Sequence, residues 1–278
     1  MEAKYTIETE KIRREFSPDW EIPEFRIEFW DGKKNNYSVV IPVINEGGRI
    51  RQFVSRLKQN NIDKVADIII VDGGSTDGSL NPDFLSLNGV KGLLTKTGSG
   101  KLGSQLRIGY SFCLAFNYEG TITIDGNNKD DPTSIPSFIK LLQNGYDFIQ
   151  ASRYIEGGEA NNTPIARNMA IRLLHAPLLS LFSGFHWTDT TQGYRGYSQR
   201  LLQNEKLSVF RSIFQNYELL AYLSAAAPRL GFKCIEFPTN RSYPYDNIPT
   251  KISWFYGNIE LFITLLKACF GSYPVKRY

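Results

Sequence analysis

The chain has 278 residues, of which 42% are hydrophobic and 22% are charged, and its formal net charge is +4. This is the composition of a folded globular protein with a large core, so a disordered chain is excluded. Lysine and arginine residues are scattered along the chain rather than gathered in one run, which argues against a nucleic-acid partner.

The cysteines and the N-terminus both indicate a protein of a reducing compartment. Cys113, Cys234 and Cys269 have neither an evident pairing nor the spacing of metal ligands. Residues 2–15 are charged and lack the apolar core of a signal peptide. The sequence therefore predicts a cytoplasmic protein, and contact with the inner face of a membrane is an open alternative.

An N-terminal extension is predicted at residues 1–36. Phe25, Ile27 and Phe29 alternate with charged residues, which is the pattern of an edge strand, and a turn follows at 31–32. No residue of this extension carries a recognisable chemical motif.

Strands alternate with helices from residue 38 to residue 151. The expected strands are 38–43, 67–72, 90–94, 121–124 and 147–151, and the expected helices are 46–60, 103–117 and 134–144. This order predicts an α/β fold with a mostly parallel sheet and helices on both faces.

Polar residues follow three of these strands at the point where each strand ends. Asn45–Glu46 follows the first strand, Asp72 ends the second, and Asp125 follows the fourth. Because parallel strands end at one edge of the sheet, where such folds bind ligands, these groups are expected to share a site. Asp125 and Asn127 are two residues apart, so an extended chain points both oxygens to one side, where they suit a hard cation or a sugar.

Several motifs, in order along the chain, resemble family 2 glycosyltransferases of the GT-A fold. They are Val39–Glu46, Ile69–Gly78 and the cluster that begins at Asp125. Three later segments resemble the dolichyl-phosphate mannose synthase branch, namely Ala151–Tyr154 with Gly157–Gly158, Asp189–Arg195 and Gln215–Leu220. The resemblance implies a glycosyltransferase domain over residues 37–253, followed by a C-terminal amphipathic helix and tail at 254–278.

The resemblance also implies a reaction. It is inverting transfer of a sugar from a nucleoside diphosphate sugar to a polyprenyl phosphate or to a hydroxyl of a glycan or lipid, in the synthesis of a cell-surface polysaccharide or glycolipid. Pro42, Glu46 and Asp72 would hold the nucleoside. Asp125 and Asn127 would hold Mg²⁺ or Mn²⁺, although the family usually has a second Asp where this chain has Asn127.

The same resemblance assigns an anion-binding set. Arg153, Arg167 and Arg195 would grip the donor diphosphate and an acceptor phosphate, a task that suits a planar guanidinium. Asp189 would take the proton of a hydroxyl acceptor, whereas a phosphate acceptor needs no strong base. The expected catalytic residues are therefore Asp125, Asp189 and Arg195.

Three further basic residues have two interpretations each. Arg241 and Lys251 lie in a Pro-containing segment that could close over the donor and reach its phosphates, or could be a solvated turn. Lys129 could carry part of the leaving-group charge, or could be a solvated loop lysine.

Two apolar stretches suit either a membrane interface or packing on the sheet. Met169–Phe185 is rich in leucine, and Trp254–Phe270 mixes aromatic and aliphatic residues before the basic Lys276 and Arg277. The longest apolar stretches, Ala176–Phe185 and Trp254–Phe270, are too short or too interrupted by polar residues to span a bilayer.

Two other functions stay open at this stage. Gly98–Gly103 fits the G-x-G-x-x-G pattern before a helix, which would make the chain an NAD(P)-binding oxidoreductase. Asn127 in place of an acid would also fit a catalytically silent relative that binds a nucleotide sugar.

Overall fold

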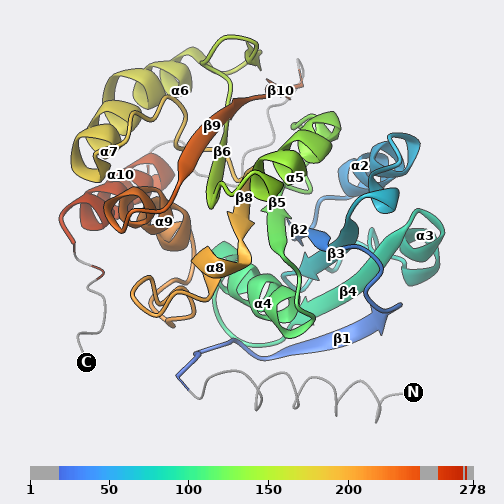
Figure 1. Ribbon diagram of the computed structural model, residues 1–278. Helices are drawn as coiled ribbons and strands as arrows, with labels where there is room; N and C mark the ends of the chain where they lie inside the picture. The colour runs from blue at the N-terminus through green and yellow to red at the C-terminus, as the bar shows by residue number, and fades with distance from the viewer. Residues whose placement is uncertain (1–18, 245–255, 272, 274–278) are drawn as a thin grey trace.

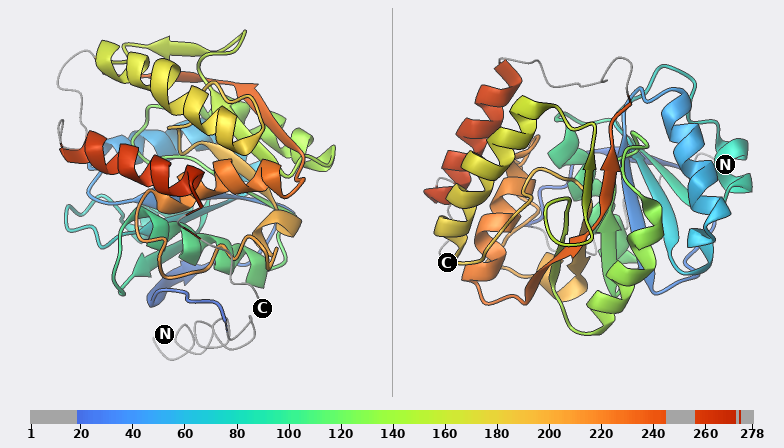
Figure 2. Two further views of the ribbon diagram at one scale, coloured as in Figure 1. Left: turned by 90° about the vertical axis from the view of Figure 1, so that its left-hand side faces the viewer. Right: turned by 90° about the horizontal axis from the view of Figure 1, so that it is seen from above.

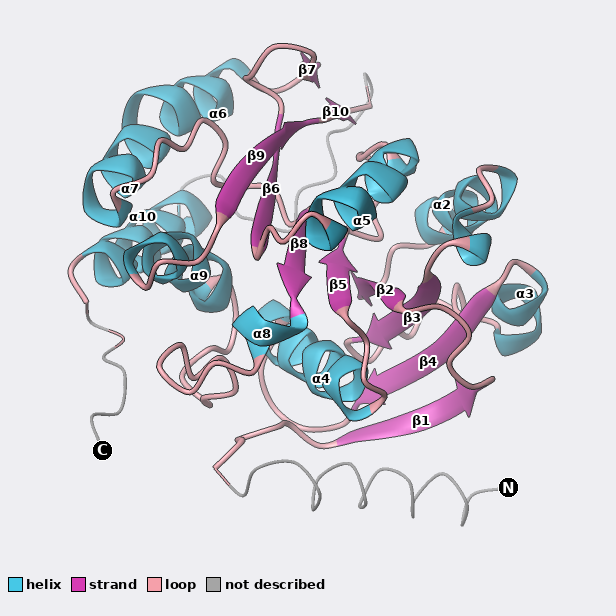
Figure 3. Cartoon of the chain, viewed as in Figure 1, coloured by secondary structure: helices cyan, strands magenta, loops and turns pink. Residues whose placement is uncertain are grey.

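The chain folds around an eight-stranded mixed sheet. The computed structural model describes residues 19–244, 256–271 and 273, with the backbone alone for residues 256–260. The strands lie in the order β1-β4-β3-β2-β5-β8-β6-β9 (Figure 3). Their bounds are β1 Phe25–Trp30, β2 Tyr37–Val43, β3 Asp67–Asp72, β4 Val90–Lys96, β5 Gly120–Thr123, β6 Phe148–Ser152, β8 Arg195–Ser198 and β9 Cys234–Pro238.

Most neighbouring strands are parallel, as the sequence predicts. β4, β3, β2 and β5 pair in parallel, and so do β6 and β9. β8 differs, because it runs antiparallel to both β5 and β6. Its first residue, Arg195, pairs with Thr123 and Gln150 near the ends of those strands. The segment before Arg195 therefore lies at the same edge of the sheet as Asp125.

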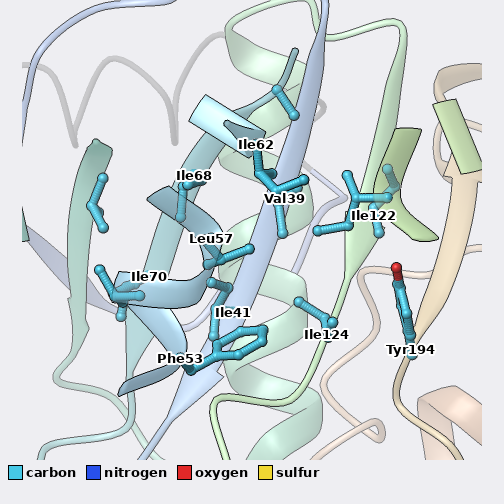
Figure 4. Close-up of a cluster of buried hydrophobic side chains, with 14 of the residues drawn as sticks. Val39, Ile41, Phe53, Leu57, Ile62, Ile68, Ile70, Ile122, Ile124 and Tyr194 are labelled. Atoms are coloured by element: carbon cyan, nitrogen blue, oxygen red, sulfur yellow. The ribbon is translucent and has the colours of Figure 1, made fainter. Parts of the chain in front are cut away.

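Each face of the sheet is buried, so the central strands are apolar on both sides. Val39 and Ile41 of β2 pack with Phe53 and Leu57 on one face, whereas Val40 belongs to the cluster on the other face. Figure 4 shows the first of these clusters.

Helices cover both faces (Figure 1). Those that contribute to the Val39 cluster are α2 Gly48–Gln59, α3 Pro82–Leu87 and α5 Ile135–Gln143, with the short turns η1 Ile62–Lys64 and η2 Pro132–Ser134 nearby. Asp131 caps the η2–α5 start by accepting a hydrogen bond from the amide of Thr133 at 3.1 Å. The opposite face is covered by α4 Leu102–Ala115.

A second helical layer lies beyond β8 and β6. Its members are α6 Ile165–Ala170, the π-helical η3 Ile171–His175, α7 Ala176–Ser183, α8 Gln199–Leu202, α9 Glu218–Arg229 and α10 Tyr256–Cys269. α10 packs against α9 and α7, on the side of the molecule away from α2 and α3 (Figure 2). No helix in the described part of the chain is long and apolar enough to cross a membrane.

The described part of the predicted N-terminal extension is built into the main sheet. The expected edge strand is confirmed as β1, which pairs antiparallel with β4. Residues 1–18 lie outside the described residues.

A two-stranded parallel sheet stands beside the main one. Its strands are β7 Glu159–Asn161 and β10 Asn240–Ser242. The predicted loop at residues 241–244 is therefore partly a strand, and Arg241 also forms an antiparallel bridge with Asp130. β10 follows β9 almost directly (Figure 1). These pairings bring Arg241 to the edge where β5 ends.

Candidate functional site

A cavity of about 770 Å³ opens where β2, β3, β5 and β6 end, and it continues between the helices of the second layer. It has three parts, which we name by their residues. The nucleoside end, named for the nucleoside contacts that the sequence predicts at Pro42 and Glu46, also includes Gly73, Lys101 and Gln105. The polar centre includes Asp125, Asn127, Lys129, Arg153, Arg167, Thr191, Arg241 and Tyr243, and the apolar end includes Ile171, His175, Leu179, Leu220, Leu261 and Leu265.

Hydrogen bonds between two loops shape the nucleoside end. The side chain of Asn45 accepts a bond from the amide of Thr76 at 2.8 Å, and Asn45 itself has a positive φ of 48°. The carboxylate of Asp72 accepts from the amide and the hydroxyl of Ser75, at 2.9 and 2.6 Å. Asp72 is 6% exposed and lies outside the cavity lining, although the adjacent Gly73 lines it. Asp72 thus holds the loop rather than facing the cavity.

Gln105 is a site residue that the sequence did not reveal. Its side-chain amide donates to the carbonyl oxygens of Val43 and Val71, at 2.8 and 2.7 Å, and so ties β2 to β3. A Cβ at Gly73 would lie 3.2 Å from this amide, which explains the close approach of the loop. Nothing in the local pattern marks Gln105, because it is one of many buried residues of α4.

Asp125 lies in the polar centre with its side chain 26% exposed. Its Oδ2 atom accepts from the side-chain amide of Asn127, with an N···O distance of 3.4 Å, and from a guanidinium nitrogen of Arg241 at 3.3 Å. Gly193 packs against it so closely that a Cβ there would lie 2.5 Å from Oδ1. Gly193, just before β8, therefore packs directly against Asp125, just after the neighbouring strand β5.

Arg241 joins the polar centre through a buried ion pair. Its guanidinium contacts the fully buried Asp130 at 2.5 Å. Burial alone would lower the pKa of Arg241, but Asp130 and Asp125 raise it well above its ordinary value. Arg241 is therefore a fixed cation beside Asp125. Lys251, the other predicted residue of this segment, lies outside the described residues.

Asp189 does not lie where a general base would be needed. It is fully buried and outside the cavity lining, and Arg153 grips it with two bonds of 2.7 and 3.0 Å. Burial lowers the pKa of Arg153, but the attraction of Asp189 outweighs this and raises it. Arg153 lines the cavity, where its predicted contact with a phosphate stays a prediction, and Asp189 orients it.

Arg195 also differs from the prediction. Its guanidinium is fully buried, outside the cavity lining, and donates to the carbonyl oxygens of Thr190, Gln192 and Leu220. The interactions bind the segment before β8 to α9. Five N–H donors in a rigid fork suit Arg for such a task. The structure places Arg195 as a support of the site and not as an anion contact.

Arg167 and Lys129 approach the ring of Tyr243 in the polar centre. Arg167 donates to the phenolic oxygen of Tyr243 at 3.0 Å, and the ammonium of Lys129 is 4.7 Å from the ring centroid. Lys129 is only 8% exposed, and burial and the nearby Arg241 lower its pKa, so it is not a solvated loop lysine. Burial alone would raise the pKa of Tyr243, but Arg241, Arg167 and Arg153 lower it to about 8.

The donor atoms of the polar centre fit a divalent metal that is shared with a substrate. Asp125 offers a carboxylate, and Mg²⁺ commonly takes one or two protein carboxylates and completes its shell with water and substrate phosphates. Asn127 directs its side-chain nitrogen to Asp125, and its side-chain oxygen accepts from the amide of Lys129 at 3.2 Å, so this oxygen would join a shared metal only after the side chain turns over. Within the described residues, no group of three His, Cys, Asp or Glu side chains could hold a metal. A closed structural metal site is therefore not present in that part of the chain.

The glycine-rich segment Gly98–Gly103 owes its glycines to close packing. A Cβ at Gly103 would lie 2.6 Å from the carbonyl oxygen of Phe214, and the amide of Lys101 donates to the carbonyl of Gln215. The start of α4, which a dinucleotide would need for its pyrophosphate, is thus in contact with the chain around residue 215. The glycines are therefore explained by packing and are not evidence for an NAD(P) site.

Comparison with known proteins places these features in context. The model of the family "Glycosyl transferase family 2" matches residues 38–205. Polyprenol monophosphomannose synthase from Mycolicibacterium smegmatis is 27% identical over 210 residues, which cover 72% of this chain and 75% of that protein. Dolichol-phosphate mannosyltransferase from Pyrococcus furiosus is 27% identical over 134 residues, which cover 48% of this chain and 37% of that protein.

The fold has solved counterparts. The crystal structure of glucosyl-3-phosphoglycerate synthase from Mycobacterium tuberculosis has a TM-score of 0.57 and 18% identity, and the match covers 84% of this chain and 80% of that one. Other crystal structures of that synthase contain uridine diphosphate together with Mn²⁺ or with Mg²⁺. At this level of identity the likeness shows the fold alone.

Proposed function

The chain belongs to glycosyl transferase family 2 and transfers a sugar from a nucleotide sugar, and we propose that it transfers this sugar to a polyprenyl phosphate with inversion at the anomeric carbon. The observation that carries the proposal is the cavity, in which a cluster of cations continues directly into an apolar channel. Such a shape fits an acceptor with an anionic head and a long hydrocarbon tail.

The apolar end supports the tail. Ile171 and Leu179, from η3 and α7, line this end together with Leu220 of α9 and Leu265 of α10. His175 also lines the apolar end, and its ring is uncharged at neutral pH because burial lowers its pKa. Isoprene units bind by burial of apolar surface, which contributes about 25 cal/mol per Å².

The polar centre supports the anionic head. Arg153, Arg167 and Arg241 all line the cavity, and guanidinium groups bind phosphate oxygens in pairs. Arg153 and Arg241 are held by the buried carboxylates of Asp189 and Asp130. Fixed cations of this kind stabilise charge that develops in the transition state without a cost of reorganisation.

The chemistry of the lining also favours a phosphate acceptor over a hydroxyl. Among the described lining residues, the carboxylates are Glu46 at the nucleoside end and Asp125. Asp189, the predicted base for a hydroxyl, is enclosed by Arg153. A phosphate is already ionised at neutral pH and needs no base.

The reaction then follows from these positions. An oxygen of the acceptor phosphate attacks the anomeric carbon from the side opposite the leaving group. The bond from that carbon to the diphosphate breaks, and its electron pair leaves with the nucleoside diphosphate. Asp125 and Asn127 would hold Mg²⁺ or Mn²⁺, a Lewis acid that stabilises the departing diphosphate. Pro42, Glu46 and the loop that Asp72 shapes would hold the nucleoside.

The surface of the second helical layer supports peripheral contact with the membrane that contains such an acceptor. Ile165, Met169, Leu173 and Leu181 lie four or eight residues apart on the α6–η3–α7 run and are 54% to 79% exposed. The π turn of η3 has more residues per turn than an α-helix and helps to keep this spacing on one side. We name these four residues the apolar stripe. Other residues of the same run line the cavity, so a lipid tail would have a short path inward.

The test is a transfer assay with matched acceptors. A thermal-shift screen of nucleoside diphosphates with and without Mn²⁺ first identifies the base, because a ligand of the folded state raises the melting temperature. The corresponding labelled nucleotide sugars are then offered with undecaprenyl phosphate, with undecaprenol and with a saccharide. We expect an acid-labile lipid product with the phosphate alone. Transfer to undecaprenol or the saccharide, with none to the phosphate, would overturn the proposal.

A further inference from the structure

Tyr243 occupies an unusual position in the polar centre. It follows β10 directly, is 3% exposed and lines the cavity. Besides the bond from Arg167 to its oxygen, its ring is 4.7 Å from the Lys129 ammonium and 5.6 Å from the Arg241 guanidinium. These cations come from three separate parts of the chain, the segment after β5, helix α6 and strand β10. The fold therefore brings positive charge to one phenol.

The hydrogen-bond chemistry of this contact leaves the phenolic proton for another partner. Arg167 can only donate, so the phenolic oxygen is the acceptor in the 3.0 Å bond. A tyrosine hydroxyl can donate and accept at once. A ligand that offers only acceptor atoms can therefore complete the arrangement, and a phosphate oxygen in a cationic cavity is such an acceptor.

We propose that Tyr243 positions a phosphate group in the polar centre by donating its phenolic proton to a phosphate oxygen between Lys129 and Arg167. The inference rests on the proposed function. The phosphate belongs either to the donor diphosphate or to the lipid acceptor, which share this chemistry. Lys129 and Arg167 supply the charge, and Tyr243 supplies a directed bond that fixes the orientation of the group.

The electrostatics of the site make this bond dependent on pH. The groups that face Tyr243 are Lys129, Arg153, Arg167 and Arg241, with Tyr154 nearby. Arg241, Arg167 and Arg153 lower the pKa of Tyr243 to about 8 against its burial. Below that pH the phenol can donate. Above it the phenolate has no proton to donate and repels the phosphate, so affinity falls.

The first measurement is a spectroscopic titration that needs no substrate. Absorbance at the tyrosinate band is followed from pH 6.5 to 10.5 in the wild-type protein and in Tyr243→Phe. The chain has 15 tyrosines, and the difference between the two curves isolates Tyr243. We expect one ionisation near pH 8 in the difference curve. A difference curve with no ionisation below pH 10 would mean that the phenol keeps its proton over the whole range, and the rise in KM with pH described next should then be absent.

The second measurement is steady-state kinetics over the same pH range, with KM determined separately for the nucleotide sugar and for undecaprenyl phosphate. For the substrate whose phosphate Tyr243 binds, we expect the wild-type KM to rise up to tenfold for each pH unit above about 8. In Tyr243→Phe this KM should be about tenfold higher at pH 7 and should lose the rise. The substrate that shows this pattern identifies the source of the phosphate.

Tyr154→Phe is the matched control. Tyr154 also lies beside arginines, 5.2 Å from Arg153 and 5.7 Å from Arg172, but it is not part of the cavity lining and its pKa is raised by burial. This variant should keep the wild-type rise in KM. If Tyr243→Phe also keeps it, or leaves both KM values unchanged at pH 7, the positioning role is wrong. A wild-type enzyme inactive on undecaprenyl phosphate would instead refute the proposed acceptor, while the titration and the Kd of the nucleotide sugar, measured by calorimetry over the same pH range, still test Tyr243.

Discussion

Asp125 and Asp189 are two carboxylates near the same edge of the sheet with opposite environments. Asp125 is partly exposed in the cavity, whereas Asp189 is fully buried against Arg153. A motif cannot distinguish them, because both are acids close to glycines in the sequence. The difference lies in what the fold brings against each one. A residue can therefore belong to a functional motif and act only by holding another residue in place.

Removing the exposed carboxylate should have the largest effect on the reaction. We expect Asp125→Ala to lower kcat/KM about 10³-fold, because the charge on the departing diphosphate loses its stabilisation. Stability should barely change, since Asp125 is partly exposed and its ion pair with Arg241 is long, at 3.3 Å. Turnover assays and urea melts of the same preparation measure both.

Asn127→Asp is the companion variant for Asp125. It adds a second carboxylate at a cavity position two residues from Asp125. We expect a higher affinity for Mg²⁺ or Mn²⁺, so that activity saturates at a lower metal concentration. If Asp125→Ala kept full activity, or Asn127→Asp left the metal dependence unchanged, the assignment of these two residues to a metal would be wrong.

Removing the buried carboxylate should affect stability instead. Asp189→Asn leaves the guanidinium of Arg153 buried without its ion-pair partner, and breaking such a pair typically costs about 3 kcal/mol. We expect this loss in the free energy of unfolding, measured by urea denaturation. The folded fraction should keep reduced but measurable activity on a lipid phosphate, because Asp189 orients Arg153 and does not itself react. A variant of wild-type stability without activity would restore Asp189 as a candidate base.

Gly193 joins the two environments, because it lies between the segment of Asp189 and the side chain of Asp125. A Cβ at this position would lie 2.5 Å from the Asp125 Oδ1 atom. Gly193→Ala should displace that carboxylate and lower kcat about 30-fold, since small misplacement of a reacting group is costly. Gly48→Ala is the control, because a Cβ there meets nothing within 4 Å, and its activity should equal that of the wild type. Equal activity of both variants would argue that Asp125 tolerates displacement.

The same contrast shows what the sequence could predict. Strand ends at Val43, Asp72 and Thr123 depend on local apolar patterns and turns, so the parallel sheet and the position of Asp125 were predicted correctly. The partners of Arg153 and Arg241 lie 36 and 111 residues away, and those pairings depend on the reversed strand β8 and on the small sheet. No local pattern encodes such pairings.

The residues that sequence reasoning missed or misplaced have a common cause. Arg195 was expected to contact an anionic ligand, but its guanidinium donates hydrogen bonds to three backbone carbonyl oxygens in the protein interior. Gln105 and Tyr243 were not assigned a role, because a buried glutamine on a helix and a tyrosine beside a proline are ordinary in sequence. Their importance comes from the groups that the fold places opposite them.

The apolar stripe permits a prediction about the outside of the same helices. Leu173→Glu combined with Leu181→Glu should reduce binding to vesicles and lower activity on vesicle-borne undecaprenyl phosphate about tenfold, because charge replaces apolar contact with the lipid. Activity on a short, water-soluble polyprenyl phosphate should not change. Leu87→Glu, on α3 and 80% exposed, is the control. An equal loss with both acceptors would indicate a defect in the cavity rather than at a membrane.

The smallest expected effect is a change with pH in the free energy of unfolding, caused by the ionisation of Tyr243. The folded protein lowers its pKa to about 8 from the ordinary value of 10, so folding favours the ionised form. The stabilisation is therefore absent below pH 8, grows between pH 8 and pH 10, and is complete above the unfolded pKa. Relative to Tyr243→Phe, the wild type should gain about 1 kcal/mol in the free energy of unfolding from pH 7 to pH 9. Urea melts of both proteins at the two pH values measure this difference. A gain of the opposite sign would mean that burial outweighs the three arginines, and that the phenol keeps its proton throughout the working range of the enzyme.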